Sequence, residues 1–291
     1  MTLRALARRF LPPRAREGLR SAAARGSASV DRMLEFVGRR GLRVWRSIIL
    51  RPRAGMDIAM LCVRKPRYVG MAVSSINSLH YRNPSCRVLL HLDNACCDSF
   101  RDEKKRLDYP GRVEPLLAGA EPSTPWQFIK LDVVLAMSAR GIPFVDADSR
   151  WHADPWPLIA RDRAMFLVEV NRFSAIGLER ALLSEGLGHP EWINFRHFNT
   201  GFVSIPAPLA TDQFALESRS LARRIYAASD VVGPASEQSW RLRHLCEELA
   251  LSLAAQAVIG PDRIVTLKGS DGPGNRNLLE SFYFGALHAV D

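Results

Sequence analysis

Short apolar runs alternate with amphipathic stretches of helical length from residue 57 to the C-terminus. The run at 57–63 (DIAMLCV) is typical of a buried strand, and the stretch at 66–80 that comes after it is typical of a helix. Further strands are predicted at 87–92, 142–145, 164–170, 202–205 and 263–267, and further helices at 126–139 and 237–257. Such alternation predicts an α/β fold in which a mixed, mostly parallel sheet carries helices on both faces.

Positive charge is concentrated at the N-terminus. Residues 1–53 hold fourteen arginines and no lysine against three acidic residues, a balance of +11, whereas the whole chain has a formal charge of +10. The remaining 238 residues therefore carry a balance of −1. We expect two parts, an Arg-rich and partly disordered N-terminal arm at 1–53 and a folded domain at 54–291.

Residues 31–50 of the arm have the pattern of a basic amphipathic helix. Met33, Val37, Val44 and Ile48 follow one another at helical spacings, and arginines cluster on the other side. Either this helix packs on the domain with a solvated basic face, or it docks on an anionic membrane surface, where each basic residue contributes about 1 kcal/mol. No nucleic-acid partner is expected, because the arm has few aromatic side chains to stack on bases.

The sequence also bears on where the protein works. We expect no membrane span, because the longest run free of Asp, Glu, Lys and Arg, at 197–211, has fifteen residues and contains two prolines. The five cysteines lack metal-site spacing, which is typical of reduced thiols. The first thirty residues contain no apolar secretion signal, although their Arg-, Ser- and Ala-rich makeup also fits an organelle transit peptide. The expectation is a cytoplasmic protein, peripheral on the inner face of the membrane if the arm docks there.

The segment at 141–158 (GIPFVDADSRWHADPWPL) is the most informative one for chemistry. An apolar run leads into Asp146 and Asp148, and a turn just past a strand can point both carboxylates at one cation. Mn²⁺ and Mg²⁺ take few protein carboxylates and complete their shells with phosphate oxygens. The alternative is a plain turn in which Asp148 caps the next segment of the chain. The preceding apolar run and the W-x-x-D-P-W after the motif favour a Mn²⁺ or Mg²⁺ site that receives a diphosphate.

These motifs resemble those of nucleotide-sugar glycosyltransferases of the GT-A fold, especially retaining enzymes like glycosyltransferase family 8. The resemblance is carried by F-V-D-A-D at 144–148, D-P-W-P-L at 154–158 and F-N-T-G-F at 198–202, and it covers the chain from about residue 57. It implies a Rossmann-like GT-A sheet and metal-dependent transfer of a sugar from a nucleotide-diphosphate donor, with a UDP-sugar favoured. It also implies that Asp146 faces the ribose and the metal, and that Asp148 ligates the metal. The acceptor stays open, and a membrane-docking arm would suit a glycolipid or a cell-envelope glycan.

The resemblance extends to two other charged side chains. Lys130 lies on the predicted helix directly before the D-x-D strand and is expected near the donor. His288 matches the position of a third metal ligand, although the glycine and lysine that come after this histidine in several families are not found here. The alternative is a histidine without a role. The loop at 269–275 (GSDGPGN) either presents backbone amides to phosphate or is a surface loop.

Asn199, Thr200 and Gly201 fall where the resembled families place contacts to the acceptor and the donor sugar, with Gly201 leaving space for the sugar. The alternative is an ordinary strand. Glu247 and Glu248 lie ten residues into the helix predicted at 237–257, and only one of them is expected to face the cleft. An inverting reaction needs such a carboxylate as the base and a retaining reaction does not, so the stereochemistry stays open. The alternative for this pair is a solvated helix face.

Asp93 and Asn94 come directly after the strand predicted at 87–92. Ligands of sheets of this kind gather at the carboxyl ends of the strands. These two residues are therefore predicted to contact the base or the ribose of the nucleotide.

Two other classes of protein remain as alternatives. Haloacid-dehalogenase-like phosphohydrolases also carry a D-x-D after a strand, with the first Asp as nucleophile, but there the motif opens the fold. Here two predicted strands precede it, and Ser149 and Arg150 come after it. The other alternative is a non-enzymatic protein that docks on membranes or nucleic acid and uses the α/β domain as a scaffold.

Overall fold

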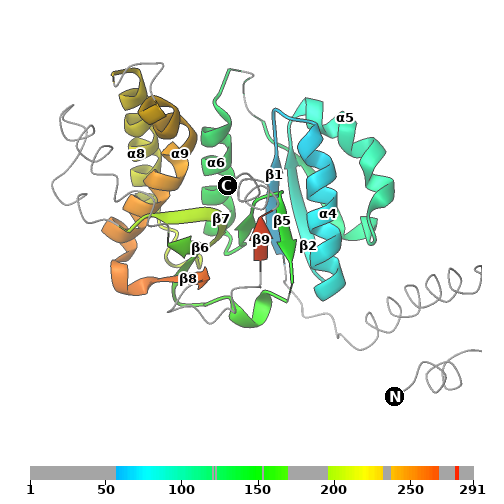
Figure 1. Ribbon diagram of the computed structural model, residues 1–291. Helices are drawn as coiled ribbons and strands as arrows, with labels where there is room; N and C mark the ends of the chain where they lie inside the picture. Colours follow the sequence, from blue (N-terminus) through cyan, green and yellow to red (C-terminus); the bar gives the residue numbers. More distant parts are fainter. Residues whose placement is uncertain are drawn as a thin grey trace, which may run out of the picture. The chain divides into compact units, whose positions relative to one another are not determined.

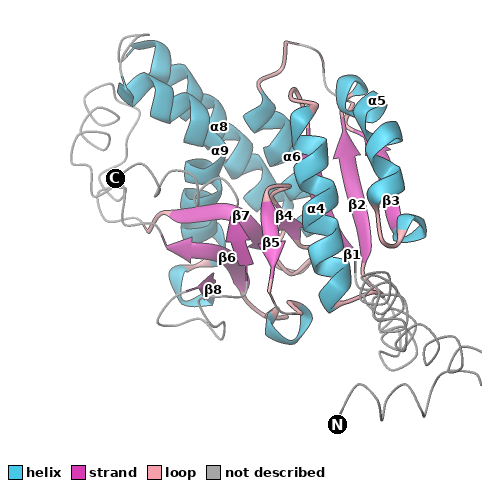
Figure 2. Ribbon diagram, turned by 45° about the vertical axis from the view of Figure 1, so that its right-hand side comes forward, coloured by secondary structure: helices cyan, strands magenta, loops and turns pink. Residues whose placement is uncertain are grey.

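A seven-stranded sheet of order β3-β2-β1-β4-β7-β6-β8 organises the domain that Figure 1 shows, and its strands are labelled in Figure 2. The computed structural model describes residues 57–119, 121, 123–152, 154–169, 196–231, 237–268 and 279–281. The chain divides into two units, Met1–Pro52 and Arg53–Asp291, and every described residue belongs to the second. The predicted arm at 1–53 and its helix at 31–50 lie outside the described residues.

Three parallel strands form one half of the sheet (Figure 2). β1 (Asp57–Cys62) pairs with β2 (Arg87–Leu92), and β2 pairs with β3 (Val113–Leu117). Helix α4 (Arg67–Arg82) comes after β1 along the chain, and α5 (Asn94–Glu103) comes after β2. The parallel strands β1 and β2 are almost continuously apolar because helices cover both faces of a sheet built in this way.

Alternate residues of β1 belong to two separate cores. Ile58 shares one core with Ile76 of α4, whereas Ala59 shares the other with Val134 of α6 (Trp126–Ala139). Successive side chains of a strand point to opposite faces of its sheet. The helices α4 and α6 therefore cover opposite faces, as Figure 2 shows.

The other half of the sheet contains one reversed strand. β4 (Phe144–Val145) is parallel to β1 and antiparallel to β7 (Phe198–Ser204). β7 is also antiparallel to β6 (Ala164–Glu169), which is parallel to β8 (Ile264–Lys268). Six of the seven strands thus share one direction. The predicted α/β fold class, a mixed and mostly parallel sheet with helices on both faces, is confirmed.

Two long helices complete the core on the α6 side. α8 (Asp212–Val231) and α9 (Glu237–Ala254) pack against each other and against α6. The smaller elements are an antiparallel pair, β5 (Ser149–Trp151) with β9 (Leu279–Ser281), a π-helical turn at Ala255–Ile259, and 3₁₀ turns at Lys104–Arg106, Pro110–Arg112, Trp156–Leu158 and Pro261–Arg263. Within the described ranges, no helix combines the length and the apolar character that crossing a bilayer requires.

Each strand and helix predicted from residue 57 onward has a counterpart: those at 87–92 and 126–139 match the predicted bounds, and the others have shifted ends. β7 begins at Phe198, four residues before the strand predicted at 202–205, so the N-T-G motif lies inside the strand. The elements α5, β3 and α8 have no predicted counterpart. β3 contains Pro115, which weakens a strand pattern, and α5 buries only Cys96 and Phe100.

Candidate active site

Polar side chains gather at the carboxyl ends of β1, β2 and β4. The chain passes from β1 to β2 on one side and later to β4 on the other, so the topological switch point lies between β1 and β4. Open α/β sheets bind ligands at such points. Cys62 lies at the end of β1. The pKa of its thiol is raised mainly by burial and then by the charges of Cys96, Asp93, Asp146 and Asp148. The three predicted aspartates therefore share one end of the sheet.

The D-x-D motif occupies a tight turn between β4 and β5. Asp146 N donates to Gly201 O at 2.9 Å, which fixes the turn against β7, and Ser149 N donates to Asp146 O at 3.3 Å, which closes it. The side chains of Asp146 and Asp148 are half-buried. The chain turns here, as both interpretations of the motif require, and both carboxylates lie at the predicted end of the sheet.

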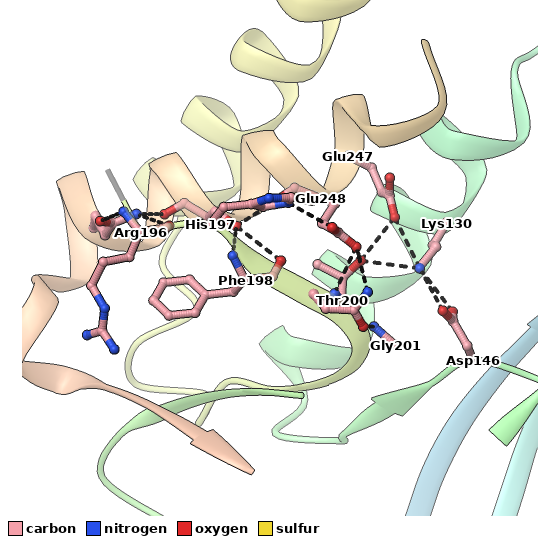
Figure 3. Close-up of polar contacts among 12 residues, drawn as sticks. Lys130, Asp146, Arg196, His197, Phe198, Thr200, Gly201, Glu247 and Glu248 are labelled. Carbon is pink, nitrogen blue, oxygen red and sulfur yellow. Dashed lines mark hydrogen bonds and ion pairs between the residues drawn. The ribbon is translucent and has the colours of Figure 1, made fainter. Parts of the chain in front are cut away.

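Lys130 of α6 contacts Asp146, the first carboxylate of the motif (Figure 3). Its Nζ is 2.9 Å from Asp146 Oδ1 and 3.1 Å from Glu247 Oε1, and it donates to Thr200 Oγ1 at 3.3 Å. Burial alone would lower the pKa of Lys130, but the charges of Asp146 and Glu247 outweigh burial and raise it. Lys130 is therefore a buried, permanently charged group that joins α6, β4 and α9.

The carboxyl group of Asp146 has an unusual pKa. Burial raises it most, Lys130 lowers it and the Asp148 charge raises it, so that the pKa is about 6 instead of 3.8. A divalent cation beside Asp146 and Asp148 would remove the cost of holding both carboxylates ionised. The donor set thus fits a hard cation in its chemistry.

The described residues do not form a complete metal site. Among them, no group of three or more His, Cys, Asp or Glu side chains could hold a metal ion. The third predicted ligand, His288, and the predicted phosphate loop at 269–275 lie outside the described residues. Among the described residues, a metal assignment therefore depends on Asp146 and Asp148.

Glu247 and Glu248 of α9 are both buried, so the alternative of a solvated helix face is wrong. Glu248 uses both oxygens: Oε1 lies 2.7 Å from His197 Nε2, and Oε2 accepts from Asn199 Nδ2 and Thr200 N, each at 3.2 Å. The Glu247 Oε1 atom accepts from Thr200 Oγ1 at 3.1 Å. Its Oε2 atom is buried and has no hydrogen-bond partner among the described residues. Of the two carboxylates, Glu247 is therefore the one with an oxygen that the described residues leave unpaired.

The N-T-G motif connects these groups within β7. Asn199 Oδ1 accepts from Gly201 N at 2.9 Å, and Thr200 is fully buried between Lys130 and the two glutamates. A Cβ at Gly201 would lie 2.8 Å from Asn199 Oδ1 and 3.1 Å from Leu167 Cδ2. Glycine is thus explained here by close packing of the protein itself, a different reason from the space for a sugar that the resemblance implies.

At the end of β2, both carboxylate oxygens of Asp93 accept hydrogen bonds from the backbone of the protein. Its Oδ1 accepts from Cys96 N at 2.9 Å, as the N-cap of α5, and its Oδ2 accepts from Arg64 N at 2.6 Å. Burial would raise the pKa of Asp93, but these two hydrogen bonds bring it below its usual value. Asn94 is exposed at the start of α5. Of this predicted pair, Asn94 has the freer side chain for a nucleotide.

Two residues of this region make contacts that were not predicted from the sequence. His197, directly before β7, supports Glu248 through a contact of 2.7 Å between its Nε2 and Glu248 Oε1. Arg64 has φ 68° and donates through its guanidinium to Thr124 O at 2.5 Å. No sequence pattern announces this backbone conformation.

The comparisons with known proteins concern the fold. No family model matches the chain, and no curated protein matches it. Among solved structures, the chain is similar to the galactosyltransferase LgtC in complex with donor and acceptor sugar analogs, at 11% identity over 72% of this chain and 73% of that chain, with a TM-score of 0.45. It is also similar to mouse xyloside xylosyltransferase 1, at 11% identity over 74% and 86% with a TM-score of 0.40. A third is the mannosyltransferase PcManGT from Pyrobaculum calidifontis with GDP-Man and Mn²⁺, at 13% identity over 87% and 88% with a TM-score of 0.31. Likeness at these identities is likeness of fold alone.

Proposed function

We propose that this chain is a metal-dependent glycosyltransferase of the GT-A type that moves a sugar from a nucleotide-diphosphate donor to a glycan or glycolipid. Among the nucleotide sugars, a UDP-sugar is the favoured donor. The observation that carries the proposal is the D-x-D turn at the end of β4, beside the topological switch point, with Lys130 Nζ 2.9 Å from Asp146 Oδ1. This arrangement holds paired carboxylates where an α/β sheet binds its ligand.

In the proposal, Asp148 and Asp146 would hold Mn²⁺ or Mg²⁺, with His288 as a third ligand. The cation would offset the charge that develops on the nucleoside diphosphate as the glycosidic bond breaks. Lys130 keeps the Asp146 carboxylate in one orientation, because its Nζ contacts both carboxylate oxygens, at 2.9 and 3.1 Å.

The two glutamates take different roles. Glu247 contacts Lys130 through Oε1, and its Oε2 has no hydrogen-bond partner among the described residues, so in the proposal Oε2 accepts a hydrogen bond or a proton from a sugar hydroxyl. Glu248 holds Asn199 and Thr200 in place and acts through them. Asn199, Thr200 and Gly201 shape the wall of the sugar site, and Asn94 contacts the nucleotide together with the α5 N-terminus that Asp93 caps.

The proposal also covers the location of the protein. The arm at 1–53 carries a balance of +11, which suits docking on an anionic membrane from the cytoplasmic side. An acceptor on a lipid or a cell-envelope glycan would then be presented to the domain at that surface.

Neither alternative class has a specific observation in its favour. A phosphohydrolase of the haloacid-dehalogenase type needs its nucleophilic Asp after the first strand, whereas β1 ends at Cys62 and the D-x-D comes after β4. A scaffold without chemistry has no need for a lysine and three carboxylates in its interior, since buried charges are costly.

A screen of nucleotide sugars tests the proposal. The full chain is incubated with UDP-glucose, UDP-galactose, UDP-N-acetylglucosamine and GDP-mannose, with and without Mn²⁺, and donor hydrolysis and the Tm are measured. We expect at least one donor to be hydrolysed and to raise the Tm in the presence of Mn²⁺. The Asp148→Asn variant is the matched control and loses both effects. Absence of hydrolysis and stabilisation with every donor would overturn the proposal.

A further inference from the structure

An exposed tryptophan stands at the start of α9. Trp240 is 58% exposed, and its ring stacks on that of His244, with centroids 4.3 Å apart and planes 24° from parallel. His244 Nδ1 lies 3.0 Å from Trp240 O, so the imidazole is tied to the backbone of the same helix. One face of the indole is thereby covered and oriented, and the other is left for a partner.

The helix connects this indole to the candidate site. Trp240, His244 and Glu247 are separated by four and three residues, so they lie on one face of α9. The same face carries the Glu247 carboxylate to Lys130, 3.1 Å away (Figure 3). Seven residues of α-helix span about 10 Å. Trp240 therefore lies about two helical turns from Glu247, on the side of α9 that faces the D-x-D region.

The sheet order separates Trp240 from the nucleotide side. Asp93 and Asn94 come after β2, whereas α9 packs on α6 and β7, beyond β4. Asp146 and Asp148 at the end of β4 lie between these two regions. A nucleotide that contacts Asn94 and the D-x-D turn therefore extends away from Trp240. The indole is left for the acceptor, which lies on the other side of the new glycosidic bond.

We propose that Trp240, stacked on His244, is a binding platform for the acceptor saccharide, with the open face of the indole against the C–H face of a pyranose ring. An indole offers a large, flat, apolar surface at low cost in conformational freedom. A sugar ring presents C–H groups on one face and hydroxyls around its edge, so stacking on the indole leaves the hydroxyls uncovered. This inference rests on the proposed function and adds the residues that bind its acceptor.

The test uses ¹⁹F NMR of the full chain labelled with 5-fluorotryptophan. The Trp240 resonance is identified as the one of the six tryptophan signals that disappears in Trp240→Phe. Lactose, maltose and cellobiose are added separately in the presence of UDP and Mn²⁺, with glycerol as the polyol control. We expect at least one disaccharide to shift the Trp240 signal and glycerol to leave it unchanged. No shift with any of the three, or a shift caused already by UDP alone, would overturn the proposal.

Kinetics with the disaccharide that shifts the signal provide the second arm. Trp240→Ala should raise the KM for that acceptor about tenfold with little change in kcat, while Trp240→Phe keeps a smaller platform and shows a weaker effect. Tyr81→Ala removes another exposed aromatic ring, on α4, and should change nothing. Equal KM values in Trp240→Ala and Tyr81→Ala would also overturn the platform.

The two proposals fail in different ways. Donor hydrolysis is measured without an acceptor in the same variants. If hydrolysis persists and Trp240 does not respond to any disaccharide, only the platform is wrong. If no nucleotide sugar is hydrolysed or stabilises the protein, the proposed function is wrong, whatever the Trp240 signal does.

Discussion

The ammonium group of Lys130 lies 2.9 Å from Asp146 Oδ1, and this ion pair joins α6 to the D-x-D turn. The Lys130 side chain is 8% exposed and that of Asp146 is 34% exposed, so the pair reaches from the core to the edge of the candidate site. Glu247 completes the contact from α9 at 3.1 Å. The position of the first D-x-D carboxylate is therefore coupled to the stability of the domain.

Removal of the lysine charge should destabilise the fold. Lys130→Met leaves Asp146 and Glu247 without their cation, and we expect it to lower the free energy of unfolding by about 3–5 kcal/mol, the cost of breaking a buried ion pair. Lys104→Met, at an exposed position, is the control and should change stability by less than about 0.5 kcal/mol. Adding Glu247→Gln to Lys130→Met should recover part of the loss. Denaturant unfolding measures all three, and equal stabilities of Lys130→Met and Lys104→Met would contradict the account.

The two D-x-D carboxylates should differ when each is replaced by an amide. Asp148→Asn is expected to lower donor turnover more than about 100-fold and to leave the Tm unchanged. Asp146→Asn should lose turnover as well, but it also weakens the ion pair with Lys130 and so lowers stability by about 1–3 kcal/mol. Turnover assays and thermal unfolding on the same preparations separate the effects. Mn²⁺-dependent turnover retained in both variants would refute the metal assignment.

The sequence predicts the D-x-D turn because its signal is local: an apolar run ends at Val145 and two carboxylates come within the next three residues. It does not predict that Lys130 contacts Glu247, since these residues are far apart in the chain and meet only when α6 and α9 pack together. The same limit applies to Glu247 and Glu248. A pair of adjacent glutamates on a helix is compatible with a solvated face, and burial by β7 and α6 decides the matter only in the folded domain.

Gly201 should tolerate no larger side chain. In Gly201→Ala, the new Cβ would meet Asn199 Oδ1 at 2.8 Å and Leu167 Cδ2 at 3.1 Å, so the ends of these two side chains must move and the hydrogen bond from Gly201 N to Asn199 Oδ1 is strained. We expect a loss of about 1–3 kcal/mol in the free energy of unfolding. Gly70→Ala in α4 is the matched control: its nearest neighbour would be Glu103 Oε2 at 4.0 Å, and alanine favours a helix by about 0.5–1 kcal/mol. Similar stabilities of the two variants would show that the packing around Gly201 relaxes easily.

Asp146 should make stability depend on pH in an unusual direction. Its folded pKa is about 6, above the ordinary 3.8, so between these values the folded protein binds more protons at this site than the unfolded chain does. The contribution of Asp146 to stability is therefore largest below about pH 4 and falls as the pH rises to about 6. The measurement is the difference in unfolding free energy between the wild type and Asp146→Asn, from pH 4 to 7. A difference that grows with pH would mean that Lys130, and not burial, dominates at this carboxyl.

Removal of the metal should abolish turnover reversibly. Dialysis against EDTA is expected to stop donor hydrolysis, and Mn²⁺ or Mg²⁺ should restore it, because two carboxylates without a cation repel the diphosphate that they are proposed to bind. His288→Ala should raise the Mn²⁺ concentration for half-maximal turnover by about 10–100-fold, the range seen when support of a metal site is lost. Tyr81→Ala is the control, since this exposed side chain on α4 is not a predicted ligand. Full turnover in EDTA would mean that Lys130 and backbone amides stabilise the leaving group without a metal. An unchanged Mn²⁺ requirement in His288→Ala would leave Asp146 and Asp148 as the metal ligands that the protein provides.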